Sequence, residues 1–228
     1  MSKKKVIVFI VEGFSDKEAL NGILSELYDR KRFVFSIIDG DITTQNSTNA
    51  NNIRAKIGDS INKSREKDKF SKKDIEMVVH LIDTDGIYIP NQNVINNDTV
   101  DILYNNDNIE TKDVNGIISR NNKKKLILNV LTTMTSIHNV PYSIFFMSCN
   151  LDHVLYNSQN AIKSEKVNLA HSFSEKYIDN PEDFVIFMSK SEFTVKGTYD
   201  YTWNFIKKDL NSLHRHSNFH LFFDKIHD

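Results

Sequence analysis

Carboxylates follow two strongly apolar stretches of this sequence. Glu12 comes directly after residues 6–11, and Asp83 and Asp85 come directly after residues 75–82. Apolar runs of this length, rich in β-branched residues, predict strands that are buried on both faces of a parallel sheet. In open α/β sheets, ligands bind beyond the carboxyl ends of such strands, where these acids stand. A buried strand does not need an acid at its end in order to fold, so the acids are candidates for chemistry.

A further acid follows another predicted strand. Asp152 comes shortly after the apolar run of residues 142–147. Because right-handed crossovers make such a sheet parallel, the strand ends should meet at one edge and gather the acids there. Clustered carboxylates cannot all stay ionised without a counter-charge. Ligand sets made only of oxygen suit Mg²⁺ or Mn²⁺ and not zinc, so we predict a site for one of these two ions.

Strand and helix patterns alternate over the first two thirds of the chain. Strands are predicted at residues 6–11, 33–38, 75–82 and 142–147. Helices are predicted after Ser15, which forms a capping-box pattern with Glu18, from about residue 51, and over residues 122–138. Residues 87–119 should be irregular, with a short hairpin near residues 102–104 and 109. The pattern predicts an α/β, Rossmann-like fold of about four parallel strands flanked by helices.

The last third of the chain has mainly helical patterns. They cover residues 164–178, a segment that begins at Pro181, and residues 201–213. We therefore predict a catalytic domain over residues 1–157 and a helical extension over residues 158–228 that packs on it.

Composition limits the class of protein. The chain has 228 residues, a net charge of −1 and one cysteine, Cys149. A single cysteine excludes an internal disulfide framework and fits a reducing compartment, so we expect a cytoplasmic protein. No apolar run reaches the ~20 residues of a membrane helix, so no membrane association is expected. A net charge near zero leaves polyanion binding to metal ions and to local basic groups. The basic groups that we predict to contact nucleic acid are Lys123, Lys124, Lys125, Lys190 and Arg215.

The turn after the first strand carries a recognisable motif. The sequence from Val11 to Lys17 reads Val-Glu-Gly-Phe-Ser-Asp-Lys, and a later strand ends in Asp-x-Asp. This combination resembles the Toprim domain, and within it the nucleases of the overcoming-lysogenization-defect (OLD) family. The resemblance covers about the first 155 residues. It implies phosphoryl transfer that depends on Mg²⁺ or Mn²⁺, with Glu12, Asp83 and Asp85 as catalytic residues.

The resemblance also implies further members of the site. In the OLD-like branch a second acid follows the glutamate by one helical turn, and Asp16 stands there in this chain. The implied metal ligands are Glu12, Asp16, Asp83, Asp85 and Asp152. A downstream lysine also takes part in that branch, and Lys190 or Lys196 could supply it; we take Lys196 as the catalytic candidate.

Within this family the missing parts favour a nuclease. There is no room for a topoisomerase gate domain, and a primase zinc module would need more cysteines. OLD nucleases usually carry an ATPase domain ahead of the Toprim part, whereas here the Toprim strand begins near residue 6, so we expect any ATPase to be a separate subunit. The interpretation is a metal-dependent endonuclease acting on DNA or RNA, plausible as the effector of a phage-defence system. Whether it forms a homo-oligomer stays open.

Three other interpretations stay open. The chain could be a non-catalytic module that binds a partner protein or senses a nucleotide. Asp83 also matches the nucleophile of haloacid-dehalogenase-like phosphatases, although those proteins usually begin with that motif. Asp39 and Asp41, after the second predicted strand, are better explained as turn formers.

Overall fold

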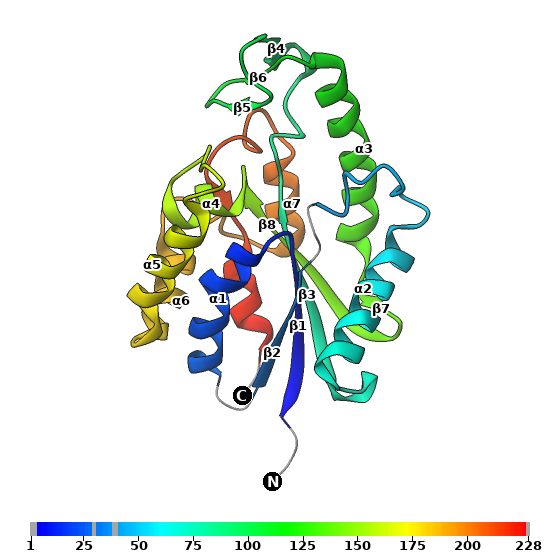
Figure 1. Cartoon of the computed structure of the whole chain (residues 1–228), viewed down its shortest axis with the longest axis vertical. Helices are drawn as coiled ribbons and strands as arrows, with labels where there is room; N and C mark the ends of the chain where they lie inside the picture. The colour runs from blue at the N-terminus through cyan, green and yellow to red at the C-terminus, as the bar shows by residue number, and fades with distance from the viewer. Residues whose placement is uncertain (1–3, 29–30, 38–40, 227–228) are drawn as a thin grey trace.

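Four parallel strands form the centre of the molecule. The structure is a computed structural model and describes residues 4–28, 31–37 and 41–226. The strands, in spatial order, are β2 (Lys31–Ile37), β1 (Lys5–Val11), β3 (Ile75–Asp83) and β8 (Val140–Ser148). Each neighbouring pair is parallel, as Figure 1 shows. The predicted α/β class and the four predicted strands are confirmed, and the arrangement is compatible with a Rossmann-like fold.

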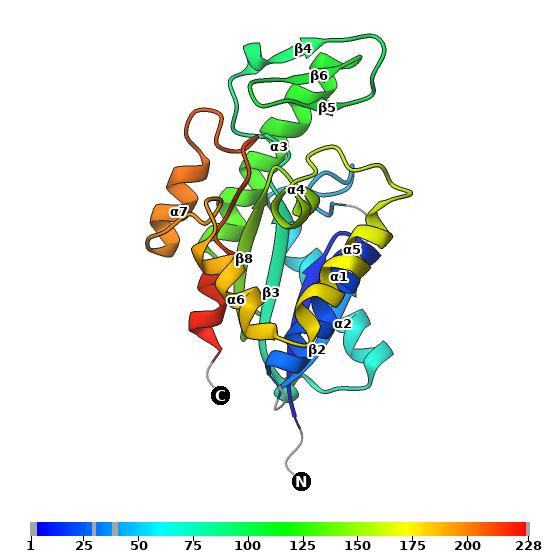
Figure 2. The same ribbon diagram turned by 90° about the vertical axis from the view of Figure 1, so that its left-hand side faces the viewer.

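Helices cover both faces of this sheet (Figures 1 and 2). Alternate residues of β1 face opposite sides: Ile7 and Phe9 pack in one apolar cluster, and Val8 and Ile10 pack in the other. The first cluster includes residues of α1 (Phe14–Leu27), α4 (Leu151–Tyr156), α5 (Lys166–Ile178), α6 (Pro181–Lys190) and the 3₁₀ helix η3 (Phe219–Lys225). The second includes residues of α2 (Ile53–Asp68), α3 (Val114–Thr133) and α7 (Tyr199–Ile206).

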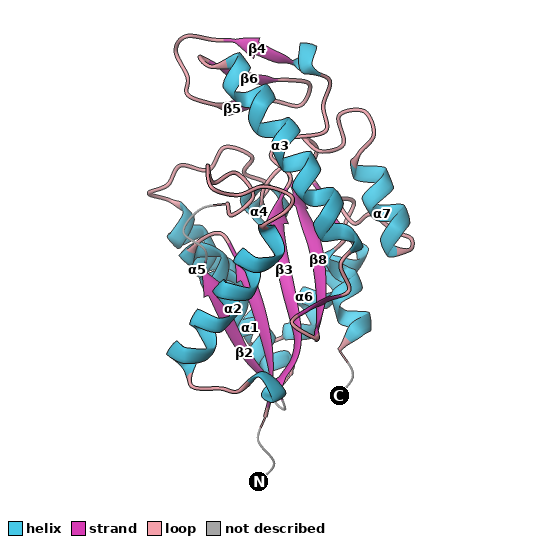
Figure 3. Ribbon diagram, turned by 90° about the vertical axis from the view of Figure 1, so that its right-hand side faces the viewer, coloured by secondary structure: helices cyan, strands magenta, loops and turns pink. Residues whose placement is uncertain are grey.

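A small second sheet lies beyond the carboxyl ends of the central strands (Figure 3). It consists of β4 (Val94–Asn96), β6 (Ile109–Thr111) and β5 (Leu103–Tyr104), in that order. The antiparallel pairing of β5 with β6 confirms the predicted hairpin. Short 3₁₀ helices precede β3 and β4, namely η1 (Lys72–Asp74) and η2 (Asn91–Asn93).

Two predicted helix starts are wrong. The helix α1 begins at Phe14, and the Asp16 carboxylate accepts a hydrogen bond from the Gly13 N–H at 3.0 Å. The N-terminal cap is therefore Gly13 with Asp16, and not Ser15 with Glu18. The helix α3 begins at Val114, well before residue 122, because the Asp113 side chain caps it. Its polar first half hid the helical periodicity.

The chain after residue 157 completes the core of the sheet. Residues of α5, α6 and η3 share the apolar cluster of β1. This segment is not purely helical as predicted, because β9 (His216–Ser217) pairs antiparallel with the end of β8. The strand β7 (Ser136–Ile137) pairs antiparallel with the beginning of β8. The helix α7 also ends at Ile206, earlier than residue 213. Within the described ranges, no helix combines the length and the apolarity that crossing a bilayer requires.

Candidate carboxylate site

Four acids from different elements line one cavity at the carboxyl edge of the sheet. Glu12 follows β1, Asp83 is the last residue of β3, Asp16 lies in the first turn of α1, and Asp152 lies in the first turn of α4. The cavity has a volume of about 500 Å³ and opens to solvent. The parallel topology thus brings Asp83 and Asp152, which are far away in sequence, to the neighbouring pair Glu12 and Asp16. Asp85, the fifth, does not line this cavity.

Hydrogen bonds fix some of the carboxylate oxygens and leave others without a partner. Asp83 Oδ1 accepts from the Leu151 N–H at 2.9 Å. Asp152 Oδ2 accepts from Lys166 Nζ at 2.5 Å. Glu12 Oε1 and Asp152 Oδ1 are buried and have no hydrogen-bond partner among the described residues. A buried carboxylate oxygen without a partner is costly, and a bound cation would remove that cost.

The pKa values of these acids also indicate that the protein does not compensate their negative charge. Burial, and then the charges of Asp41 and Asp85, raise the pKa of Glu12 well above its ordinary value. Burial and the neighbouring Glu12 do the same to the pKa of Asp83. Burial raises the pKa of Asp16 to about 6. These acids therefore cannot all be ionised together unless a cation neutralises them, which is the electrostatic condition for binding a divalent cation.

The side chains are not yet arranged around a common ion position. Across the residues that the structure describes, no three acids, histidines or cysteines form a group that could hold a metal ion as they stand. The donor set nevertheless fits Mg²⁺ or Mn²⁺ chemically, because it consists of carboxylate oxygens, two of them buried without partners. Side-chain rotation would have to bring them to a shared ion.

Asp85 has a separate role in this structure. Its Oδ2 accepts from Lys124 Nζ at 2.5 Å, and its Oδ1 accepts from the Tyr104 hydroxyl at 3.2 Å. Arg120 donates to the Asp85 carbonyl oxygen at 2.9 Å. Burial alone would raise the pKa of Asp85, but the charges of Lys124 and Arg120 outweigh it and lower that pKa. Asp85 is thus ionised and already neutralised by protein groups.

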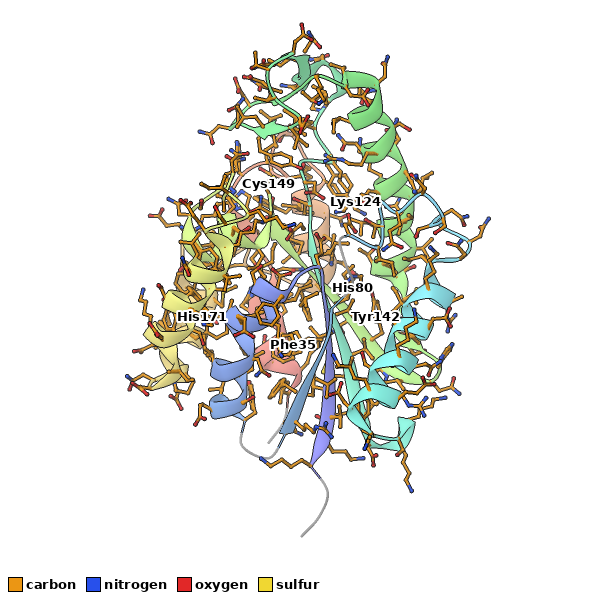
Figure 4. The ribbon with its side chains drawn as sticks, in the orientation of Figure 1. Phe35, His80, Lys124, Tyr142, Cys149 and His171 are labelled. Carbon is orange, nitrogen blue, oxygen red and sulfur yellow. The ribbon has the colours of Figure 1, made fainter. Side chains whose placement is uncertain are left out.

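The predicted role of Lys124 as a surface contact to nucleic acid is wrong. Its side chain is 0% exposed, and its ammonium pairs with Asp85 and also with Asp41 Oδ2 at 2.5 Å. Figure 4 shows Lys124 near the carboxyl ends of the strands, above His80. Lys124 therefore reaches the acidic ends of the strands.

The sequence contained a signal for the burial of Lys124. Lys124, Ile127, Leu128 and Leu131 are all buried, and their spacing follows one face of a helix. A lysine in an apolar stripe needs a buried partner, which an acid at a strand end can supply. Asp41 is one of the two acids that pair with the Lys124 ammonium. It also accepts from the Thr43 N–H, so its predicted role in a turn is confirmed. Asp39 lies outside the described residues.

The other predicted basic contacts are dispersed. Lys123 donates to the Gln45 carbonyl oxygen at 2.5 Å, and Lys125 is partly buried. Lys190 and Arg215 line a different cavity of about 560 Å³, where the Arg215 guanidinium lies 4.7 Å from the Phe193 ring centroid. Lys196 is exposed and does not line the carboxylate cavity.

Lys166 is the basic residue that the sequence reasoning missed. It stands at the first position of α5, lines the carboxylate cavity and contacts Asp152. Burial lowers its pKa, but the hydrogen bond and charge of Asp152 outweigh burial and raise it, so the ammonium form is favoured. No spacing in the sequence linked this lysine to Asp152, because the link depends on how α5 packs against α4.

Comparison with known proteins adds no relative: no protein family, no curated protein and no solved structure matches this chain. The fold defines the class only coarsely, as a mostly parallel α/β sheet with helices on both faces.

Proposed function

We propose that this chain is a Toprim-type, divalent-metal-dependent nuclease that hydrolyses phosphodiester bonds in DNA or RNA. The observation that carries the proposal is the pair of buried, unpartnered oxygens, Glu12 Oε1 and Asp152 Oδ1, in a cavity that Asp16 and Asp83 also line. A catalytic site for phosphodiesters needs such a surplus of carboxylate, because the metal ions that hold a phosphate must themselves be held.

The residues that line the cavity would have different roles in the reaction. Glu12, Asp83, Asp16 and Asp152 would hold Mg²⁺ or Mn²⁺, which when bound activates water and neutralises charge on the phosphate. Glu12 would also serve as the general base for the attacking water, because it lines the cavity that the metal ligands share. Lys166 can donate to a non-bridging phosphate oxygen, because its ammonium lies at the cavity wall.

This assignment replaces Lys196 by Lys166 as the catalytic lysine. The two lysines differ in position: Lys166 lines the cavity and bonds to Asp152, whereas Lys196 is exposed on a segment that does not line it. We further propose, from the sequence resemblance, that the enzyme is an effector in phage defence that works with an ATPase. From the single cysteine we propose that it acts in the cytoplasm.

The proposal is tested by incubating the purified protein with plasmid DNA, tRNA and ribosomal RNA in Mg²⁺, Mn²⁺ or EDTA. We expect cleavage of at least one substrate with either metal and none in EDTA. Asp83→Asn should abolish cleavage, while Asp59→Asn, at an exposed position of α2, should leave it unchanged. If all substrates stay intact, a non-catalytic module is favoured. If Asp83→Asn cleaves like the wild type, the assignment of the nuclease site to this cavity is wrong.

A further inference from the structure

Exposed apolar side chains surround the mouth of the carboxylate cavity. Phe14 is 51% exposed and Val167 is 38% exposed, and both line the cavity. Ile162 is 60% exposed and lies in sequence between two lining residues, Ala161 and Lys163. We call Phe14, Ile162 and Val167 the apolar rim. The remaining exposed large apolar residues of the described chain lie on other elements, namely Ile95, Leu126, Ile186 and Tyr201.

The packing of α1 does not explain why an aromatic residue stands at position 14. The buried face of α1 is formed by Ala19, Leu20, Ile23 and Leu24, and Phe14 lies outside it at the first helical position. Among the described residues, the Phe14 ring faces the Lys17 ammonium, whose Nζ lies 5.8 Å from the ring centroid. A large aromatic side chain that is left in solvent beside a polar cavity is typical of a binding surface.

The chemistry around the rim indicates what it binds. Lys166 and Lys163 line the same cavity, and Lys17 adjoins Phe14. Once the proposed metal ion neutralises the carboxylates, a matching ligand carries negative charge for the metal ion and the lysines, and a flat apolar group for the phenyl ring. An unpaired nucleobase next to a backbone phosphate has both properties. In a duplex the base faces are stacked inside the helix and cannot reach such a ring.

We propose that the apolar rim binds an unstacked nucleobase of a single-stranded nucleic acid, with Phe14 as the stacking platform. This inference rests on the proposed function and deepens it, because it selects single strands, loops or frayed ends as substrates. Phe14 lines the same cavity as Glu12 and Asp16, so a base on its ring would bring the adjacent phosphate to the carboxylates. Ile162 and Val167 extend the apolar contact around the mouth.

The test is a binding measurement, which does not depend on cleavage. A fluorescein-labelled single-stranded DNA dodecamer and the corresponding duplex are titrated with protein in Ca²⁺, and the dissociation constants are read from fluorescence anisotropy. Phe14→Ala should weaken single-strand binding by about 10-fold, since base–aromatic stacking has that magnitude, and leave duplex binding unchanged. Phe14→Trp should bind the single strand at least as tightly as the wild type. Tyr201→Ala, an exposed aromatic on α7, is the matched control and should change nothing.

Several outcomes would overturn the inference. One is wild-type single-strand affinity in Phe14→Ala; a second is an equal loss for single strand and duplex; a third is a wild-type protein that binds neither form. In the first case the rim is better explained as a contact surface for another protein. Cleavage that depends on Asp83 together with binding that ignores Phe14 would refute only the stacking platform. Binding that depends on Phe14 without any cleavage would refute only the nuclease.

Discussion

Replacing Lys124 by methionine tests whether the buried charge cluster at the strand ends is as tightly balanced as the structure indicates. Methionine preserves most of the length and the apolar stem of lysine but removes the ammonium. Asp41 and Asp85 would then lose the ammonium that bridges them, because Lys124 Nζ lies 2.5 Å from a carboxylate oxygen of each. Asp85 would keep only the charge of Arg120 to offset its own. The burial of Asp85 would be offset less well, and its pKa would rise.

The expected loss of stability is large. Removing one partner from a buried ion pair costs about 3–5 kcal/mol, because the remaining charge stays buried without compensation. Asp41 and Asp85 are 10% and 19% exposed at their side chains, and this limited exposure to water favours the lower half of that range. We therefore expect Lys124→Met to lower the free energy of unfolding by about 3 kcal/mol at pH 7, measured by urea denaturation.

Two further variants make this result decisive. Lys123→Met, the neighbouring residue, loses only hydrogen bonds to backbone carbonyls and should cost about 1 kcal/mol or less. The double variant Lys124→Met with Asp85→Asn should recover part of the loss, since it removes one of the uncompensated charges. If Lys124→Met costs no more than Lys123→Met, the buried cluster does not hold the strand ends together, and our account of Asp85 is wrong.

Three other predictions concern the cavity. Asp83→Asn should abolish Mn²⁺ binding measured by calorimetry, whereas Asp85→Asn should retain most of it, because only Asp83 lines the cavity; equal losses would contradict the division between the two acids. Lys166→Ala should reduce turnover by about 10²-fold with little change in KM, and Lys166→Arg should restore part of it; unchanged turnover would remove Lys166 from catalysis. The raised pKa of Asp16, about 6 in the folded protein, means that the metal-free folded state binds more protons than the unfolded state. Its stability should therefore fall as pH rises from about 4 through 6, and Mg²⁺ should raise Tm more at pH 8 than at pH 5. A Tm increment independent of pH would contradict this.

The sequence predicted the sheet well because apolar strand patterns are local. Each central strand was visible as a mainly apolar run, and the parallel order followed from the helices between the runs. The convergence of Glu12, Asp83 and Asp152 could be predicted for the same reason, since topology alone brings the ends of parallel strands together. Residues 114–121 were missed as helix because polar residues there obscure the period of the apolar positions.

The sequence could not separate Asp83 from Asp85. The two acids are two residues apart in one Asp-x-Asp motif, and nothing in the motif distinguishes a free ligand from a paired one. The difference arises from α3, which places Lys124 against Asp85, and from β5, which places Tyr104 there. Such contacts depend on the packing of distant elements, and only the structure reveals them.

The acids at the carboxyl edge of the sheet form two groups, one that Lys124 neutralises and one that it does not. Lys124 neutralises Asp41 and Asp85, and its charge reaches Glu12 and Asp83 only as a weaker effect that does not offset their burial. A second buried lysine near Glu12 would satisfy the cavity and leave no need for a cation. In this fold the buried Lys124 ammonium, which α3 carries, pairs with Asp85. Glu12 Oε1 and Asp152 Oδ1 have no hydrogen-bond partner among the described residues. Under the proposed function, the acids that pair with Lys124 would hold the strand ends in place. The acids with unpartnered oxygens would bind the ion.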